Sequence, residues 1–233
     1  LFLGLPLIKT VQALFLIANF LTLLGAYLLG RRLTNQASGL LLATLYGLAP
    51  YRAVNLVVRG ALSELWGMAL YPFIFYALLG LQAGKKGSAL LLTLSWTALI
   101  LSHNLSALIL TPFFFLLVAH HWFRGHQKRI LLQSFLAFFL SLALSAYYVL
   151  PALIEVGSTQ IKTQLLAGYF HYSNHFLYLR QFFQATWSYG GSGWGPDDGI
   201  SFFLGYGFLF ALFSLFLFFL FQLWTHWRRS AGE

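Results

Sequence analysis

Long apolar runs restrict most strongly what this chain can fold into. Seven stretches are almost free of charged residues: roughly 10–29, 37–50, 65–82, 88–102, 105–123, 130–150 and 202–223. A helix needs about 20 apolar residues to cross the ~30 Å hydrocarbon core of a bilayer. Only 8% of the residues are charged, against roughly 25% in soluble domains. The sequence therefore predicts an all-α polytopic membrane protein with about seven transmembrane helices, and we expect one integral membrane domain over 1–233.

The second run is the shortest and ends at Ala49-Pro50. Proline disfavours a continuous helix because it lacks an N–H and restricts the residue before it. Three alternatives remain open at this point: a tilted span, a span continued by 51–58, or a re-entrant segment.

The polar connectors between the runs fall into two alternating sets. The basic set comprises 31–36, 83–88, 124–129 and 225–229, and it holds nine of the 14 lysines and arginines and no acid. The other set comprises 51–64, the 102–104 turn and the long segment 151–201, with four of the five acids. Positively charged loops stay in the cytoplasm, so we expect 51–64, 102–104 and 151–201 to be extracytoplasmic. The net charge of +9 then reflects topology, which favours membrane lipid over nucleic acid as a partner.

This orientation starts the first span outside the cytoplasm, which requires an earlier helix. The chain begins with Leu rather than Met, and we expect it to be a piece of a longer protein.

The stretch YRAVNLVVRGALSELW, residues 51–66, places charges between two apolar runs. At 100° per residue, one helical stripe of about 80° holds Arg52, Asn55, Arg59 and Ser63, and Glu64 lies about 100° away. Arginine matches the geometry of phosphate, and its cost in mid-bilayer favours the headgroup level. Arg52 and Arg59 are therefore predicted to bind a lipid headgroup or a lipid-linked phosphate. The alternative is a Glu–Arg pair with arginines that anchor a helix end.

Two further polar groups are predicted at the same rim. His103, in the turn Ser102-His103-Asn104, is a candidate base, metal ligand or hydrogen-bond donor to phosphate. The alternative is a polar turn residue. Glu155 closes the sixth span, either as a helix-end carboxylate or as a reactive group.

The segment 151–201 is long enough to suggest a function or disorder, and its aromatic residues argue against disorder. Its turn Trp194-Gly195-Pro196-Asp197-Asp198-Gly199 is a candidate site for a divalent ion or for sugar hydroxyls, or an ordinary Asp-Gly turn. His171 and His175 have the spacing of a two-His metal site, without the glutamate of a HExxH motif. The aromatics of this segment are compatible with sugar stacking and equally with an interfacial belt.

Five motifs occur in order along the chain: RGALSELW at 59–66, SHNLSAL at 102–108, PALIE at 151–155, HFLYLRQFF at 175–183 and GPDDGISFFLG at 195–205. Together they resemble a group of bacterial membrane proteins described as "6-pyruvoyl-tetrahydropterin synthase-related domain; membrane protein". That resemblance implies a multi-pass protein of the bacterial cytoplasmic membrane. The His triad of the soluble pterin synthases has no counterpart here, so neither a pterin nor a nucleotide is expected.

The resemblance further implies kinship with the GT-C glycosyltransferases, which take sugars from polyprenyl-phosphate carriers outside the cytoplasm. In that superfamily an acid of the first external loop commonly acts as base, and this chain is expected to begin after that loop. The implied catalytic candidates are Glu64, His103 and Glu155. The implied substrate-binding candidates are Arg52, Arg59, Asn104, Trp194, Asp197 and Asp198.

A divalent metal is compatible with these residues, but no ligand set is defined. Two alternatives to a glycosyltransferase remain open. One is a transporter or flippase for a lipid-linked glycan, although such proteins favour charged or broken helices near mid-membrane. The other is a non-catalytic scaffold whose external segment binds a partner.

Overall fold

The computed structural model describes residue 4 and residues 6–125, 128–160 and 168–230, and within these ranges the chain forms helices and no strand. The main helices are α1 (Leu7–Leu33), α2 (Gln36–Gly47), α3 (Pro50–Ala53), the π-helix η1 (Val54–Val58), α4 (Leu62–Gln82), α5 (Ser88–Ser102), α6 (Asn104–Gly125), α7 (Lys128–Leu144), α8 (Ala146–Ile154) and α10 (Tyr206–Ser230). Short 3₁₀ turns follow α8: η2 (Glu155–Ser158), η3 (Gly168–Phe170), η4 (Tyr172–His175) and η5 (Leu179–Phe182). Residues 126–127 of the third basic connector and 161–167 of the predicted external segment lie outside the description.

Each of the seven predicted runs is mostly helical where it is described, which confirms the all-α membrane class. Four helices are long and apolar enough to span a membrane, namely α1, α4, α6 and residues Tyr206–Thr225 of α10. Among the described residues two bent helix pairs pass the same test, each as a broken span or a re-entrant segment: α2 with Pro50–Val58, at 52°, and α7 with Ala146–Ser158, at 69°. The helix α5 is apolar but has only 15 residues. The described residues thus hold four to six candidate spans, against the about seven that the sequence predicts.

The first of the two breaks has a local cause. Ala49 precedes a proline and has φ −57° and ψ 125°, the extended conformation that residues before proline prefer. Of the three alternatives for the second run, the bend excludes a straight tilted span, and a broken span continued by 51–58 and a re-entrant segment both fit it. The sixth run, predicted as one helix over 130–150, breaks at Ser145, where ψ is 1° rather than helical.

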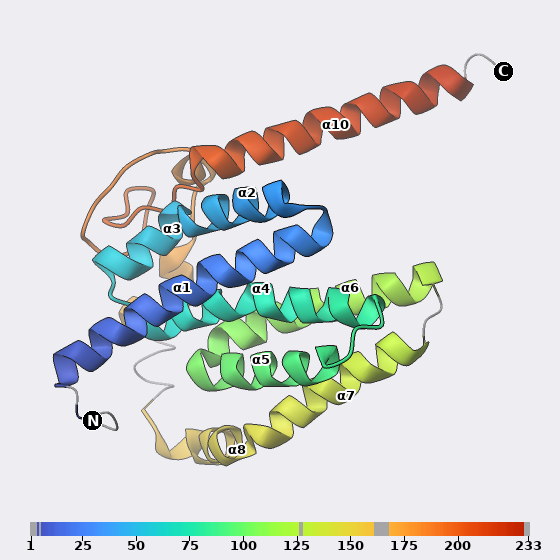
Figure 1. Cartoon of the computed structure of the whole chain (residues 1–233). Helices are drawn as coiled ribbons and strands as arrows, with labels where there is room; N and C mark the ends of the chain where they lie inside the picture. Colours follow the sequence, from blue (N-terminus) through green and yellow to red (C-terminus); the bar gives the residue numbers. More distant parts are fainter. Residues whose placement is uncertain (1–3, 5, 126–127, 161–167, 231–233) are drawn as a thin grey trace.

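The helices form an antiparallel bundle (Figure 1). Helix α1 packs on α2 and α4, α4 packs on α5, and α5 contacts both α6 and α7. The connectors after α1, α4 and α6 lie at one end of the bundle, whereas α3, η1 and the segment after α8 lie at the other (Figure 1). The basic and acidic connectors are thus separated at opposite ends, as their alternation predicts.

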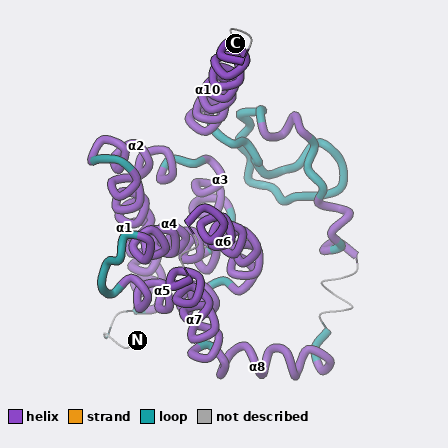
Figure 2. Tube along the Cα trace, turned by 90° about the vertical axis from the view of Figure 1, so that its right-hand side faces the viewer, coloured by secondary structure: helices purple, strands orange, loops and turns teal. Residues whose placement is uncertain are grey.

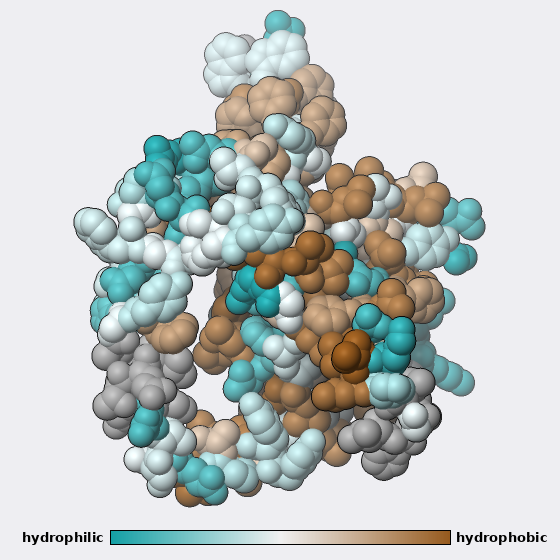
Figure 3. All heavy atoms as spheres, turned by 90° about the vertical axis from the view of Figure 1, so that its left-hand side faces the viewer, coloured by the Kyte–Doolittle hydropathy of each residue, from teal (hydrophilic) through white to brown (hydrophobic). Residues whose placement is uncertain are grey.

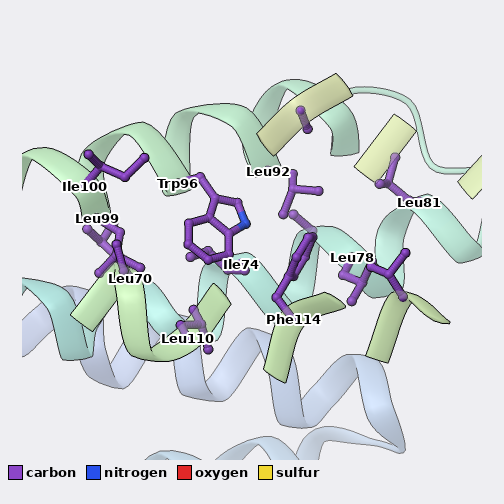
Figure 4. Packing of buried hydrophobic residues seen from close by; sticks show 14 residues of the cluster. Leu70, Ile74, Leu78, Leu81, Leu92, Trp96, Leu99, Ile100, Leu110 and Phe114 are labelled. Carbon is purple, nitrogen blue, oxygen red and sulfur yellow. The ribbon is translucent and has the colours of Figure 1, made fainter. Parts of the chain in front are cut away.

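A buried hydrophobic cluster joins α4, α5, α6 and α7 (Figure 4), and aromatic contacts within and beside it link α5, α6 and α7. Trp96 and Phe114 are fully buried. The Trp96 ring centroid lies 5.3 Å from that of Phe114 and 5.2 Å from that of Phe138, both edge to face. Each such pair contributes about 0.5–1.5 kcal/mol beyond the burial of its area. The cluster therefore gives the short helix α5 a firm place in the bundle.

Helix α10 stands away from the bundle (Figure 2). None of its spanning residues is buried, although its first turn lies against Leu45 and Pro50. A helix that is apolar all round suits a lipid environment.

Candidate functional site

The site-bearing end of the bundle is shaped by an irregular stretch between α3 and α4. Residues Val54–Val58 form a π-helix, whose i→i+5 turns rotate later residues relative to a regular α-helix. Gly60 then adopts φ +58°, a left-handed conformation that glycine takes without steric cost. Helix α4 begins directly afterwards at Leu62. The chain therefore reverses direction here, and Glu64 comes into contact with Arg59.

Arg59 is the centre of a compact polar network. Its Nη1 donates to Glu64 Oε2 at 2.7 Å and to Asn55 Oδ1 at 2.6 Å. The Tyr51 hydroxyl donates to the other carboxylate oxygen of Glu64 at 2.9 Å. The stripe predicted for Asn55 and Arg59 is therefore present. The charge of Arg59 is balanced by Glu64, as in the alternative that treats them as a structural pair.

Arg52 has different surroundings, although it was predicted on the same stripe. Only 6% of the residue is exposed. Its Nη1 donates to the carbonyl of Gly47 at 2.7 Å, and Nη2 donates to Asn19 Oδ1 of α1. Its Nε is buried and has no hydrogen-bond partner among the described residues. The described part of the chain contains two ion pairs, Arg59–Glu64 and Arg180–Asp197, and neither includes Arg52.

A buried guanidinium without a carboxylate is costly, because its charge is removed from water and not balanced. Arg52 therefore makes this point of the fold electropositive and able to hold an anion.

Arg52 lines a cavity of about 450 Å³ together with Tyr46, Tyr51 and Met68. The rest of the wall is apolar and comes from Ala49, Leu177, Phe182, Phe202, Phe203, Leu204 and Phe208. Residues 168–204, which we call the lobe, thus cover the cavity, although they are far from Arg52 in the sequence. Figure 3 views this end of the molecule, where hydrophilic side chains lie beside strongly apolar ones. The combination suits a ligand that has both an anionic group and an apolar part.

His103 caps helix α6. Its Nδ1 accepts from the backbone N–H of Ser106 at 3.2 Å and lies 2.6 Å from the Ser106 hydroxyl oxygen. The close approach to α4 depends on Gly67, where an added Cβ would lie 3.3 Å from His103 Cβ. Gly67 is one turn beyond Glu64 on α4, so His103 and Glu64 flank the same helix end.

Asn104 and Glu155 lie elsewhere. The Asn104 amide donates to the Tyr148 hydroxyl of α8 at 3.3 Å, away from Arg52. Glu155 is exposed at the end of α8, and no side-chain hydrogen bond of this carboxylate is seen within the described ranges. Helices α8 and α3 lie on opposite sides of the bundle (Figure 2). The structure therefore does not bring Glu155 to the arginines.

The adjacent acids of the lobe fasten it internally. Asp197 pairs with Arg180, and Asp198 accepts from Gln181 Nε2 at 2.6 Å and from the Gly193 N–H at 2.7 Å. Trp194 is 85% exposed and projects from the turn. These contacts correspond to the turn alternative for this motif.

The two lobe histidines are occupied separately. His171 Nδ1 lies 2.7 Å from the Ser173 hydroxyl, whereas His175 Nε2 lies 2.7 Å from the carbonyl of Tyr169. Within the described residues no group of three or more His, Cys, Asp or Glu side chains could hold a metal ion.

Three residues of the site were not predicted from the sequence: Asn19, Tyr46 and Tyr51. Asn19 is an amide in the middle of the apolar run of α1, which is a usable signal because buried amides in membrane helices need partners. The tyrosines give no such signal, since Tyr is common at membrane interfaces for other reasons.

Comparison with known proteins identifies a family. The family model described as "6-pyruvoyl-tetrahydropterin synthase related domain; membrane protein" matches residues 2–212. No curated protein and no solved structure matches the chain.

Proposed function

The chain belongs to the family of 6-pyruvoyl-tetrahydropterin synthase related membrane proteins, and from this premise we propose that it is the membrane part of a GT-C-like glycosyltransferase. The donor is a sugar carried on polyprenyl phosphate. Transfer takes place at the extracytoplasmic face of the bacterial cytoplasmic membrane, where the proposal places the end of the bundle that carries Arg52 and the lobe.

The observation that carries the proposal is the surroundings of Arg52. When the sugar–phosphate bond breaks, negative charge develops on the polyprenyl phosphate. A fixed cation in a site that excludes water stabilises that charge strongly. Arg52 is buried, lacks a carboxylate partner in the described structure and faces a mainly apolar cavity. The apolar wall suits the first isoprenoid units of the carrier.

The acceptor hydroxyl must lose a proton during transfer, and a carboxylate or imidazole within hydrogen-bond reach can accept it. We assign this side of the reaction to Glu64 and His103, which flank the N-terminal end of α4. Tyr51 and Arg59 fix the orientation of the Glu64 carboxylate. Asp197, Asp198 and Trp194 shape the lobe above the cavity, and Glu155 and Asn104 have no part in this proposal.

Proteoliposomes with a labelled polyprenyl-phosphate sugar test the proposal. Wild-type protein is expected to cleave the sugar–phosphate bond, and Arg52→Gln is expected to lower the rate by about 100-fold or more, the usual cost of removing one stabilising donor. Arg52→Lys keeps the positive charge but not the forked guanidinium group, and its cleavage rate should lie between those of wild type and Arg52→Gln. Arg31→Gln, at the opposite end of the bundle, serves as the control and should retain the wild-type rate.

A transporter of lipid-linked glycans is the second candidate, favoured by the two broken spans. The same assay separates the two, because a transporter moves the donor across the bilayer without cleaving it. Movement without cleavage, or full cleavage by a correctly folded Arg52→Gln variant, would contradict the glycosyltransferase proposal.

A further inference from the structure

A second pocket lies at the opposite end of the bundle from Arg52. It has a volume of about 230 Å³ and lies where the α4–α5 turn meets the start of α7. Helices α5 and α7 pack against each other along their length. The polar side of the pocket is formed by Lys85 and Lys86 of the turn and by Arg129 and Gln133 of α7.

The glycines of the turn explain how the lysines come to the pocket. Gly84 has φ +63°, and the backbone N–H of Lys85 donates to the carbonyl of Gly80 at 2.9 Å. This is a Schellman ending, which stops α4 and reverses the chain. Gly87 has φ +79° and precedes α5 without any side-chain cap. The first N–H groups of α5 therefore lack a side-chain acceptor at the edge of the pocket.

The charges at this pocket are all of one sign. Lys85, Lys86 and Arg129 are exposed, and neither of the two ion pairs seen in the described ranges lies at this end. Like charges around a small concavity repel one another and raise the local positive potential. Lysine, arginine and an uncapped helix start are all groups that bind phosphate.

Arg32 shows that not every cation at this end is available. Its Nη1 donates to the carbonyl of Tyr76 at 2.7 Å, and its guanidinium lies 3.5 Å from the centre of the Tyr76 ring. The positive-inside rule requires only net charge at this end. It does not require three of the cations to line one pocket, two from the α4–α5 turn and one from α7.

We propose that this pocket binds the phosphate group of an anionic membrane lipid. Its volume suits a glycerophosphate group rather than a whole lipid. The acyl chains lie over exposed apolar side chains that adjoin lining residues in the sequence, such as Leu90 beside Ala89 and Leu132 beside Gln133, which are 62% and 69% exposed. Basic pockets between membrane helices on the cytoplasmic side are suited to anionic headgroups. The site is independent of the proposed glycosyltransferase activity.

Two triple variants with the same change in charge test the proposal. The pocket variant is K85Q/K86Q/R129Q, and the control variant is R31Q/R124Q/K128Q, whose residues lie at the same end but do not line the pocket. Binding of phosphatidylglycerol and phosphatidylcholine to the purified protein is measured by native mass spectrometry.

Wild-type protein is expected to prefer phosphatidylglycerol by about tenfold or more, since each basic residue near an anionic surface contributes roughly fivefold. The pocket variant should lose this preference, whereas the control variant should keep it within about twofold. An equal loss in both variants, or retention in the pocket variant, would overturn the proposal. If the pocket triple does not fold, the single Arg129→Gln variant is expected to lower the preference by about threefold or more, and no change would count against the site.

Inorganic phosphate distinguishes a lipid from a soluble ligand. Inorganic phosphate added to the delipidated protein should leave the melting temperature unchanged, because it lacks the acyl chains, whereas phosphatidylglycerol should raise it in wild-type protein and not in the pocket variant. Equal stabilisation by inorganic phosphate would contradict the lipid assignment.

Discussion

At the scale of single residues, Arg52 and Arg59 belong to one stretch of chain, yet they have different partners. Arg59 is balanced by Glu64 at 2.7 Å, whereas Arg52 is buried with an unpaired Nε. The proline at position 50 and the π-helix that follows rotate the two side chains to different surroundings. Of the two arginines predicted to bind phosphate, Arg52 is therefore the one whose charge is not already neutralised in the described structure.

His103 combines a capping role with its proposed place beside the acceptor, and two substitutions separate these roles. Asparagine is a good N-cap, so His103→Asn should retain thermal stability, whereas His103→Ala should lose about 1 kcal/mol of stability. If the imidazole also serves the acceptor, both variants should lose sugar transfer. Stability follows from thermal unfolding, and transfer from the proteoliposome assay. Full transfer by His103→Asn would restrict His103 to the cap.

The sequence predicted which residues of the site are polar, but not which of them meet. The 51–66 stripe is correct for Asn55 and Arg59, since they lie within one turn and their contact is local. Arg52 bonds to Gly47 and Asn19 instead, and the regular helix that the stripe assumes gives way to a π-helix from Val54 on. The role of Asn19 depends on how α1 packs against α3, which local periodicity does not contain.

At the scale of elements, the apolar runs were predictable because span length and hydrophobicity are properties of the chain alone. The break at Pro50 has a visible cause in the sequence. The break at Ser145 has none, since neither proline nor glycine lies within four residues of it. The aromatic residues of the lobe predicted that it is ordered. Its position over Arg52 was not predictable, because this contact joins residues far apart in the chain.

The lobe is held by contacts that single substitutions can remove. The Gly190 N–H donates to the carbonyl of Gly199 at 2.6 Å, and a Cβ on Gly190 would lie 2.8 Å from that same oxygen. The lobe thus needs glycine at this crossing, with Asp198 bonded beside it.

Asp198→Ala is expected to loosen the lobe. It leaves the half-enclosed Gly193 N–H and the buried Gln181 amide without their acceptor, a cost of about 1–3 kcal/mol per buried group. Hydrogen exchange of lobe amides should increase clearly. Asp197→Ala is the matched control, because the Asp197 side chain is 88% exposed and exposed ion pairs contribute about 0–1 kcal/mol. Equal exchange in the two variants would contradict this role for Asp198.

At the scale of the whole molecule, the account depends on the two ends of the bundle. One end carries Arg52, Glu64, His103 and the lobe, and the other carries the basic connectors and the phosphate pocket. The separation of the ends was predictable from charge alternation, because each span reverses the chain. The positive-inside rule assigns the pocket end to the cytoplasm and the Arg52 end to the outside, and both proposals require this orientation.

Labelling of single cysteines tests this orientation most directly, since the chain contains no cysteine of its own. Ser63→Cys and Ser158→Cys report on the Arg52 end, and Thr34→Cys and Ala83→Cys report on the basic end; all four positions are exposed. In intact spheroplasts, a membrane-impermeant maleimide is expected to label positions 63 and 158 at once, and positions 34 and 83 only after permeabilisation. Labelling of 34 and 83 from outside, or of 63 and 158 from opposite sides, would contradict the account.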